Sequence, residues 1–377
     1  MKSFSSLAAR LGVGIVIYAG SAGLAFGQTP AAKPTSYVVP QKPFGQPDIS
    51  GFWSNSTLTP MVRAAKYKDE AVFTPEQVQQ IEGAAVAEFK SDQKPTDPKA
   101  GAEYRAANPN ERPEFKAAGG AVGGYNYFWL DPGSKIMRVN GEPRTSLITT
   151  PDGQIPKTIS GKQPNARGYG EGGPAGASTR RPYANLDYET RSQGERCIIG
   201  FGRNGGPPMF PNGFYNNDYQ IIQTPKNVVI EVEMNHDTRI IRLNGQHRKD
   251  DLRPYFGDSI GHWDGDTLVV ETNHIPQAQA FMGSWKNLTV TERFKRVGPD
   301  RLDYQFTVDD PTMWSKPWGG EYEFHPMKGV IYEYACHEGN YALPGILSGN
   351  KSDYEKAEAK NGTKKGKAAP RIASNRG

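Results

Sequence analysis

The sequence predicts a mainly β fold built on an antiparallel sheet that curls or closes on itself. Short runs rich in Val, Ile, Thr, Tyr and Phe recur between residues 135 and 335. In the segments VIEVEMN and LTVTERFKRV, every second side chain is apolar or β-branched, which is typical of strands with one buried face. Turn residues follow at Asn244-Gly245, Asp264-Gly265 and Gly298-Pro299, and they favour hairpins over helical crossovers.

The two ends of the chain have compositions that differ from its middle. Residues 1–27 have the order of a signal peptide, with Lys2 and Arg10, an apolar run over 11–25, and small residues before Gln28. We therefore expect a periplasmic or extracellular protein without stable membrane insertion, and the alternative is a permanent N-terminal anchor. Residues 28–47 are predicted to be a linker. Residues 349–377 are predicted to be a disordered basic tail, or alternatively a handle for anionic surfaces.

Residues 48–348 are predicted to form a single β-barrel-like domain. The expected strands cover 135–139, 145–150, 219–223, 228–234, 239–243, 267–272, 288–296, 302–308 and 330–335, after one short strand near Trp53. One early helix is expected over 73–89, because Thr74, Pro75 and Glu76 form a helix start and apolar residues follow at helical spacing. The long Gly- and Pro-rich segments, above all 151–211, are expected to be covering loops.

The chain has two cysteines, Cys197 and Cys336. An even and sparse count in an exported protein favours one disulfide over a metal site. The alternative is a free nucleophilic Cys336 beside His337, which oxidising surroundings disfavour.

One candidate catalytic cluster is Asn235-His236-Asp237-Thr238-Arg239, where one expected strand passes to the next. His236 is a candidate base, Asp237 its orienting carboxylate, and Arg239 a cation for developing negative charge. The alternative is a turn in which Asp237 bonds its own backbone and Arg239 covers the sheet.

A second candidate cluster, His337-Glu338, follows Cys336. A bridged Cys336 would hold both side chains on stiff backbone, as an acid or base requires. In the structural alternative, His337 caps a strand and Glu338 pairs with an arginine. The segment GHWDGD at 261–266 is interpreted mainly as a hairpin, with a cation site at Asp264 or Asp266 as the alternative.

Aromatic residues outside the expected strands are candidates for binding a planar apolar ligand or for forming the core. The candidates for contact with a substrate include Tyr125, Trp129 and Trp314. The sequence has no phosphate-loop, zinc-protease, Rossmann or nucleophile-elbow motif. We therefore expect no organic cofactor, no nucleic-acid partner and no recognisable metal motif, although folding could still assemble histidines and aspartates around a metal.

The order of the motifs PDISGFW, YNYFWLDPG, YNNDYQIIQTP, EMNHDTRIIRLNG and YEYACHEGNY resembles a widespread family of exported, mostly uncharacterised bacterial proteins. The resemblance covers about residues 47 to 347. Similar proteins of aromatic-degrading bacteria are associated with the cleavage of lignin aryl ethers. The resemblance implies functional roles for Asn126, Trp129, Asn216, Asn217, His236, Asp237, Arg239, His337 and Glu338.

Together these observations predict an antiparallel barrel resembling the calycin or lipocalin type, with long covering loops and one early helix. The leading functional hypothesis is an exported, cofactor-independent hydrolase or lyase for a small aromatic or apolar molecule. A lignin-derived β-aryl ether is the first substrate to consider. The alternatives are a non-catalytic carrier of an apolar ligand and a structural envelope protein, and the sequence does not indicate an oligomeric state.

Overall fold

The computed structural model describes residues 37–92, 133–161, 188, 193–194, 196–200, 204–211, 217–327, 329–336, 338–339 and 341–361. The chain divides into two compact units, Met1–Val38 and Val39–Gly377. All the helices and strands of the described residues belong to the second unit.

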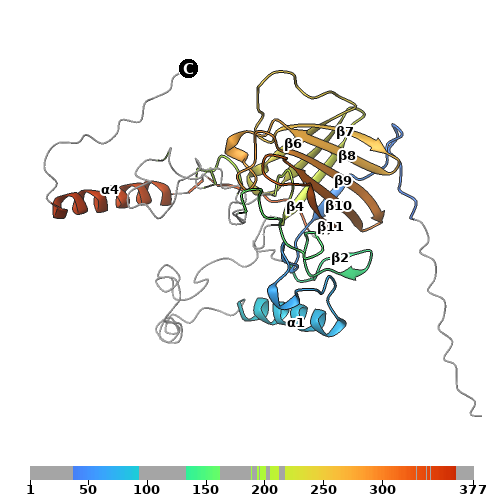
Figure 1. Cartoon of the computed structure of the whole chain (residues 1–377), viewed down its shortest axis with the longest axis horizontal. Coiled ribbons are helices and arrows are strands. Elements are labelled where there is room, and N and C mark those ends of the chain that lie inside the picture. The colour runs from blue at the N-terminus through green and yellow to red at the C-terminus, as the bar shows by residue number, and fades with distance from the viewer. Residues whose placement is uncertain are drawn as a thin grey trace, which may run out of the picture. The chain divides into compact units, whose positions relative to one another are not determined.

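Nine strands close into a barrel, and its neighbouring strands β6 to β11 can be followed in Figure 1. The predicted mainly β fold is confirmed. The order around the barrel is β1-β11-β10-β9-β8-β7-β6-β5-β4, and β4 pairs with β1 to close it. The strands are β1 (Gly51–Ser54), β4 (Asp218–Gln223), β5 (Asn227–Val232), β6 (Thr238–Leu243), β7 (Asp258–Asp264), β8 (Thr267–Asn273), β9 (Thr289–Gly298), β10 (Arg301–Asp309) and β11 (Trp318–Pro326).

One strand pair departs from the predicted antiparallel order. β6 and β7 are parallel, with Arg242 opposite Ile260 and Leu243 opposite Gly261. Parallel neighbours need a crossover, and residues 244–257 supply it, so the hairpin predicted at Asn244-Gly245 is wrong. The hairpins predicted at Asp264-Gly265 and Gly298-Pro299 are confirmed, because they join β7 to β8 and β9 to β10.

Two predicted strands are wrong, and two strands of the barrel were missed. Residues 145–150 contribute only an isolated bridge from Ile148 to Gly320, and residues 330–335 form no strand. β7 and β11 were not predicted, and β11 contains the glycine pair that resembles a turn. A Cβ added at Gly319 would lie 2.0 Å from the carbonyl oxygen of Phe306 on β10. Glycine is therefore required there by the close approach of two strands, not by a turn.

The early helix is confirmed as α1 (Pro75–Asp92). It starts with a capping box, in which Thr74 Oγ1 accepts from Gln77 N–H and Gln77 Oε1 accepts from Thr74 N–H. Glu82 on α1 accepts hydrogen bonds from Ile136 N–H and from Lys135 and Arg138, so the helix packs on the segment with the small hairpin β2 (Arg138–Val139) and β3 (Glu142–Pro143). That segment in turn contacts β11, where Asn140 N–H donates to Glu323.

A second helix, α4 (Ala342–Asn361), overlaps the first part of the segment predicted to be a disordered tail. Short 3₁₀ turns occur at η1 (Ala65–Tyr67), η4 (Met234–His236) and η5 (Gln277–Gln279). Within the described residues, neither α1 nor α4 combines the length and the hydropathy of a membrane-spanning helix.

The barrel interior is filled by large side chains. Tyr219 stacks on Phe324, and Phe306 meets Phe210 and Trp318 edge to face. Phe210 belongs to residues 204–211, whose Met209 N–H and carbonyl oxygen bond the hydroxyls of two inward tyrosines. This segment therefore plugs the interior instead of leaving it open.

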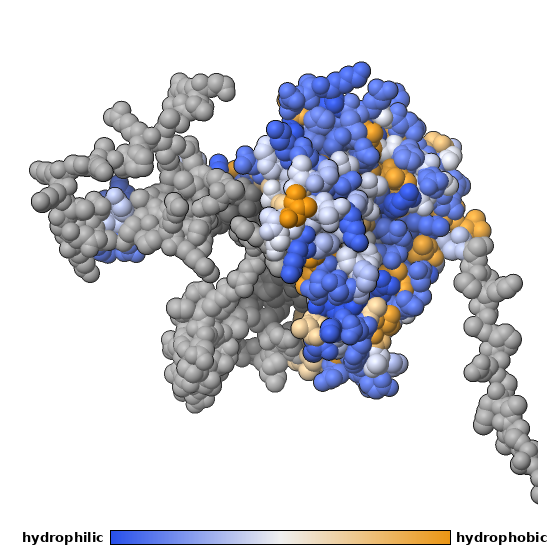
Figure 2. Space-filling model, viewed as in Figure 1, coloured by the Kyte–Doolittle hydropathy of each residue, from blue (hydrophilic) through white to orange (hydrophobic). Residues whose placement is uncertain are grey.

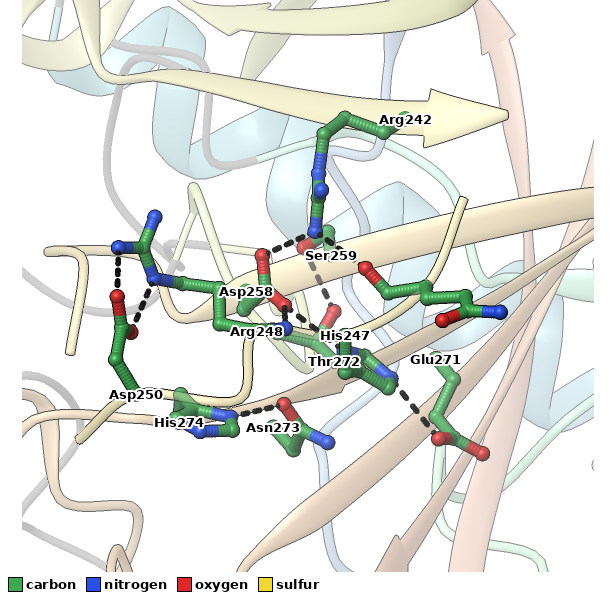
Figure 3. A network of polar contacts seen from close by, with 11 residues as sticks. Arg242, His247, Arg248, Asp250, Asp258, Ser259, Glu271, Thr272, Asn273 and His274 are labelled. Carbon is green, nitrogen blue, oxygen red and sulfur yellow. Dashed lines mark hydrogen bonds and ion pairs between the residues drawn. The ribbon is translucent and has the colours of Figure 1, made fainter. Parts of the chain in front are cut away.

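A polar network on the outer face holds the crossover between β6 and β7 (Figure 3). His247 lies between two carboxylates, with Nδ1 3.0 Å from Asp258 and Nε2 3.0 Å from Glu271. Asp258 also accepts from Arg242 and from Arg248 N–H, at 2.6 and 2.8 Å. The start of the crossover is thus tied to β6, β7 and β8 at once.

Candidate functional site

The candidate site is the turn between β5 and β6, where the sequence places Asn235, His236 and Asp237. Asn235 and His236 both have left-handed backbones, with φ of 59° and 52°. This region is uncommon for any residue other than glycine, although asparagine and histidine adopt it more often than most. Strain of this kind costs on the order of 1–3 kcal/mol per residue and persists only where surrounding contacts fix it.

Two chain segments distant in sequence fix this turn. Gly200 N–H donates to Asp237 Oδ2 at 3.0 Å, and Tyr334 N–H donates to His236 Nε2 at 3.3 Å. Cys197 and Cys336, which lie close to these two donors in sequence, form the predicted disulfide, with a Cα–Cα distance of 5.8 Å. The disulfide thus joins the two segments that hold His236 and Asp237 from either side.

The side chain of His236 lines a hollow of about 410 Å³ on the outer side of the barrel. Two carboxylates, Glu231 and Glu333, line the same hollow, as do the half-exposed rings of Phe52 and Tyr332. His236 Nδ1 has no hydrogen-bond partner among the described residues. The hollow therefore combines an exposed imidazole, negative charge and aromatic surface.

Asp237 is mostly buried beside this turn. Burial raises the pKa of its carboxyl from 3.8 to about 6, against hydrogen bonds from Gly200 N–H and the Asn235 side chain that lower it. The described contacts of Asp237 are to these neighbours, and none is to the ring of His236. The predicted orientation of His236 by Asp237 therefore has no support in these contacts, and a backbone amide holds the ring instead.

Arg239 does not join His236, because strand alternation turns it into the barrel. Its guanidinium makes two hydrogen bonds to Glu292, Nη1 to Oε2 at 2.7 Å and Nη2 to Oε1 at 3.0 Å. Tyr304 donates its hydroxyl proton to the same carboxylate at 2.8 Å. Arg239 and Glu292 are both almost fully buried, so the predicted role of Arg239 beside a leaving group is corrected to a structural ion pair.

The other predicted site residues are dispersed. Asn217 is fully buried, and its side-chain oxygen accepts from Asn204. Trp314 is buried in the core, and its indole N–H donates to the carbonyl oxygen of Pro156. The prediction that Trp314 contacts a substrate is therefore corrected to a role in core packing. Glu338 is exposed. The remaining predicted residues, Tyr125, Asn126, Trp129, Asn216 and His337, lie outside the described residues.

The segment at 261–266 follows its predicted structural interpretation. It ends β7 and turns into β8, and His262 is exposed on the outer face. In the part of the chain that the structure describes, no three His, Cys, Asp or Glu side chains are arranged to hold a metal ion.

Sequence reasoning missed Glu292 and Tyr304, although a signal for Glu292 was present. In LTVTERFKRV the inward positions include Val290, Glu292 and Phe294, so a carboxylate occupies a core position. A buried charge needs a partner, and Arg239, which precedes the buried Ile241 on its strand, is the matching cation. Only the strand order could have shown that the two meet.

The chain was compared with protein-family models, with curated proteins and with solved structures, and no significant match was found.

Proposed function

We propose that the chain is an exported hydrolase or lyase that acts on a small aromatic or apolar molecule without an organic cofactor. The reaction takes place in the hollow beside His236, and a lignin-type β-aryl ether is the first substrate class to test. The observation that carries the proposal is the strained backbone of His236, held by Tyr334 N–H next to a disulfide and facing an aromatic and acidic hollow. Backbone strain clusters at functional sites.

The hydrogen bond from Tyr334 N–H to Nε2 favours the ring tautomer with its proton on Nδ1. When that bond opens, Nε2 takes a proton from solvent, and the carboxylates of Glu231 and Glu333 stabilise the resulting imidazolium. The imidazolium then gives its Nδ1 proton to the leaving oxygen and returns to neutral imidazole. For an aryl ether, protonation of the oxygen as the C–O bond breaks releases a phenol. A water or a neighbouring substrate hydroxyl is the nucleophile, and Glu231 or Glu333 takes its proton.

Export is part of the proposal because a disulfide between Cys197 and Cys336 is typical of proteins that fold in oxidising surroundings. The residues before the barrel domain have the signal-peptide order. The face shown in Figure 2 is mainly hydrophilic, with apolar residues in separate spots, so this face does not favour an envelope protein that binds partners through an apolar surface.

The test is incubation of the purified chain with a panel of aryl ethers and simple esters, with and without a chelator, while released phenols are followed by chromatography. The wild type is compared with His236→Ala and with His262→Ala, whose imidazole is exposed on the outer face of β7. We expect turnover in the wild type and His262→Ala, and a loss of about 100-fold or more in His236→Ala. If the wild type releases no product from any compound of the panel, the result would contradict the proposal and favour a non-catalytic carrier of an apolar ligand.

A further inference from the structure

A larger hollow of about 790 Å³ lies where β11 ends and the chain leaves β1. Its walls include Phe324 and His325 at the end of β11, Met327 just after it, Ser54 at the end of β1, Ser56 two residues further along the chain, and Tyr332. Hollows of this volume are large enough for a drug-sized ligand. The chemistry of this hollow differs from that of the His236 hollow, because it contains hydroxyl groups in contact with an imidazole.

Ser54, Ser56 and His325 form a chain of hydrogen bonds along one wall. Ser54 Oγ donates to Ser56 Oγ at 3.2 Å, and Ser56 Oγ lies 3.4 Å from His325 Nε2. The register of β1 against β11 causes this meeting, because Ser54 is directly opposite His325. The two serines are almost fully buried, whereas His325 is exposed to the hollow.

His325 can accept the hydroxyl proton of Ser56 at Nε2 only when the other ring nitrogen, Nδ1, carries the proton of the neutral ring. His325 Nδ1 lies 3.4 Å from the carbonyl oxygen of Pro326, and a carbonyl can only accept. With the proton on Nδ1, the ring donates to this carbonyl and its Nε2 lone pair is available to the hydroxyl of Ser56, which is the tautomer that a base requires. The carbonyl oxygen of Ser56, 3.3 Å from Nε2, can then accept from Nε2–H once the ring is protonated.

We propose that Ser56 is the nucleophile, and His325 its base, of an ester-hydrolysing site separate from the His236 hollow. Such a pair, with a third group that orients the base, is the arrangement by which serine is activated in covalent catalysis. The substrate class is a carboxylic ester whose apolar part packs on Phe324 and Tyr332. Arg138 and Arg301 line the same hollow, ion-paired with Glu82 and Glu323, and carboxylates line it as well. The guanidinium groups of these two arginines are the candidates for stabilising the negative charge that develops on the ester carbonyl oxygen.

Water is the only co-reactant that the reaction requires. His325 Nε2 takes the proton of Ser56 as Oγ bonds to the ester carbonyl carbon, and the C–O bond to the alcohol breaks as the alcohol oxygen takes that proton. Water then attacks the acyl-serine, releases the carboxylic acid and returns the proton to Ser56 through His325. No oxidant, reductant or cofactor is needed.

The test uses a fluorophosphonate, which adds covalently to activated serines, on the full chain. We expect one adduct, mapped by peptide mass spectrometry to Ser56, and we expect no labelling in Ser56→Ala. His325→Ala should lower both the labelling rate and the hydrolysis of p-nitrophenyl esters by about 100-fold or more. Ser134→Ala is the matched control, because Ser134 lines the same hollow and has no imidazole contact among the described residues, and it should label normally.

The adduct map of the wild type does not depend on whether a variant folds. An absence of labelling, or an adduct on a serine other than Ser56, would overturn the proposal. His236→Ala should label like the wild type, so failure of the proposed His236 reaction and failure of the Ser56 site give different results. Loss of labelling in folded His236→Ala would contradict the separation of the two sites.

Discussion

Arg239 and Glu292 form an ion pair across the inside of the barrel, from strands β6 and β9 that are separated in the sheet by β7 and β8. The side chains are 2 % and 0 % exposed. Two hydrogen bonds between them and a third from Tyr304 satisfy both carboxylate oxygens. The pair therefore joins two strands that are not neighbours in the barrel wall. Because both side chains are shielded from water, solvent cannot stabilise either charge if its partner is removed.

Removal of one partner of this pair should be strongly destabilising. Glu292→Gln should lower the free energy of unfolding by about 3–5 kcal/mol, because it leaves the Arg239 charge buried without a counter-ion. The control is Arg293→Gln, the next residue on β9, whose side chain is 45 % exposed and should change stability by about 0.5 kcal/mol or less. Urea denaturation measures both values. Equal stability of Glu292→Gln and the wild type would mean that the pair does not form.

The disulfide should support both the stability of the fold and the geometry of the turn at His236. Its cysteines are 139 residues apart, so chain-entropy arithmetic gives a stabilisation of up to about 4–5 kcal/mol. The variant Cys197→Ser/Cys336→Ser should unfold at lower urea concentration than the wild type. Its Gly200 and Tyr334 amides, which bond Asp237 and His236, should exchange hydrogen faster. Unchanged exchange at these two amides would show that the turn is held without the disulfide.

Asp237 should make the stability depend on pH between about 4 and 6. Its pKa is about 6 in the folded chain and 3.8 when unperturbed, so the folded state binds the proton more tightly. The stabilisation from this tighter proton binding is fully present below the pKa of Asp237 in the unfolded chain. It is lost as the pH rises through the pKa in the folded chain. Asp237→Asn should be more stable than the wild type at pH 7, and the two should converge at pH 4. Parallel stability curves for the two proteins would contradict the raised pKa.

Asp258 should have the opposite pH dependence. Burial opposes ionisation of this carboxyl, but hydrogen bonds from Arg248 N–H and His247 and the charge of Arg242 outweigh it and lower the pKa below 3.8. The stabilisation is present above the unfolded pKa and is lost as the pH falls through the folded one. At pH 7, Asp258→Asn should lower the free energy of unfolding by about 2 kcal/mol.

The control for Asp258 is Asp250→Asn. Asp250 also bonds Arg248, but 61 % of its side chain is exposed, so the change should be small. Denaturation at pH 7 and pH 3 checks both variants. A deficit of Asp258→Asn that does not shrink toward pH 3 would exclude ionic stabilisation of the crossover.

Much of the barrel could be predicted because alternation and turn chemistry are local signals. The strands with every second residue apolar, such as β5 and β9, were found within one or two residues. The bounds of α1 were found within three residues, and two hairpins were also found. β11 was missed because Gly319 and Gly320 resemble a turn, whereas close packing against Phe306 requires them. The parallel pairing of β6 with β7 was missed because Asn244-Gly245 is a strong local hairpin signal, and the network around Asp258 overrides it.

The candidate site was predictable only in part, because its contacts come from segments distant in sequence. The disulfide and the position of His236 between two strands follow the sequence interpretation. The grouping of His236, Asp237 and Arg239 does not, because alternation directs Arg239 into the barrel and Asp237 bonds Gly200 instead of the imidazole. Ser56 and His325 carry no local signal, since strand pairing between β1 and β11 alone brings them together.

The proposed reaction requires His236 to exchange a proton with a substrate in the hollow that it shares with Glu231 and Glu333. The most direct test is the rate of phenol release from the best aryl ether of the panel, measured for the wild type, His236→Ala and His236→Gln at equal folded concentration. We expect kcat to fall about 100-fold or more in both variants, while the circular dichroism spectrum and the urea midpoint of His236→Gln remain close to those of the wild type. An unchanged kcat in folded His236→Gln would contradict the claim.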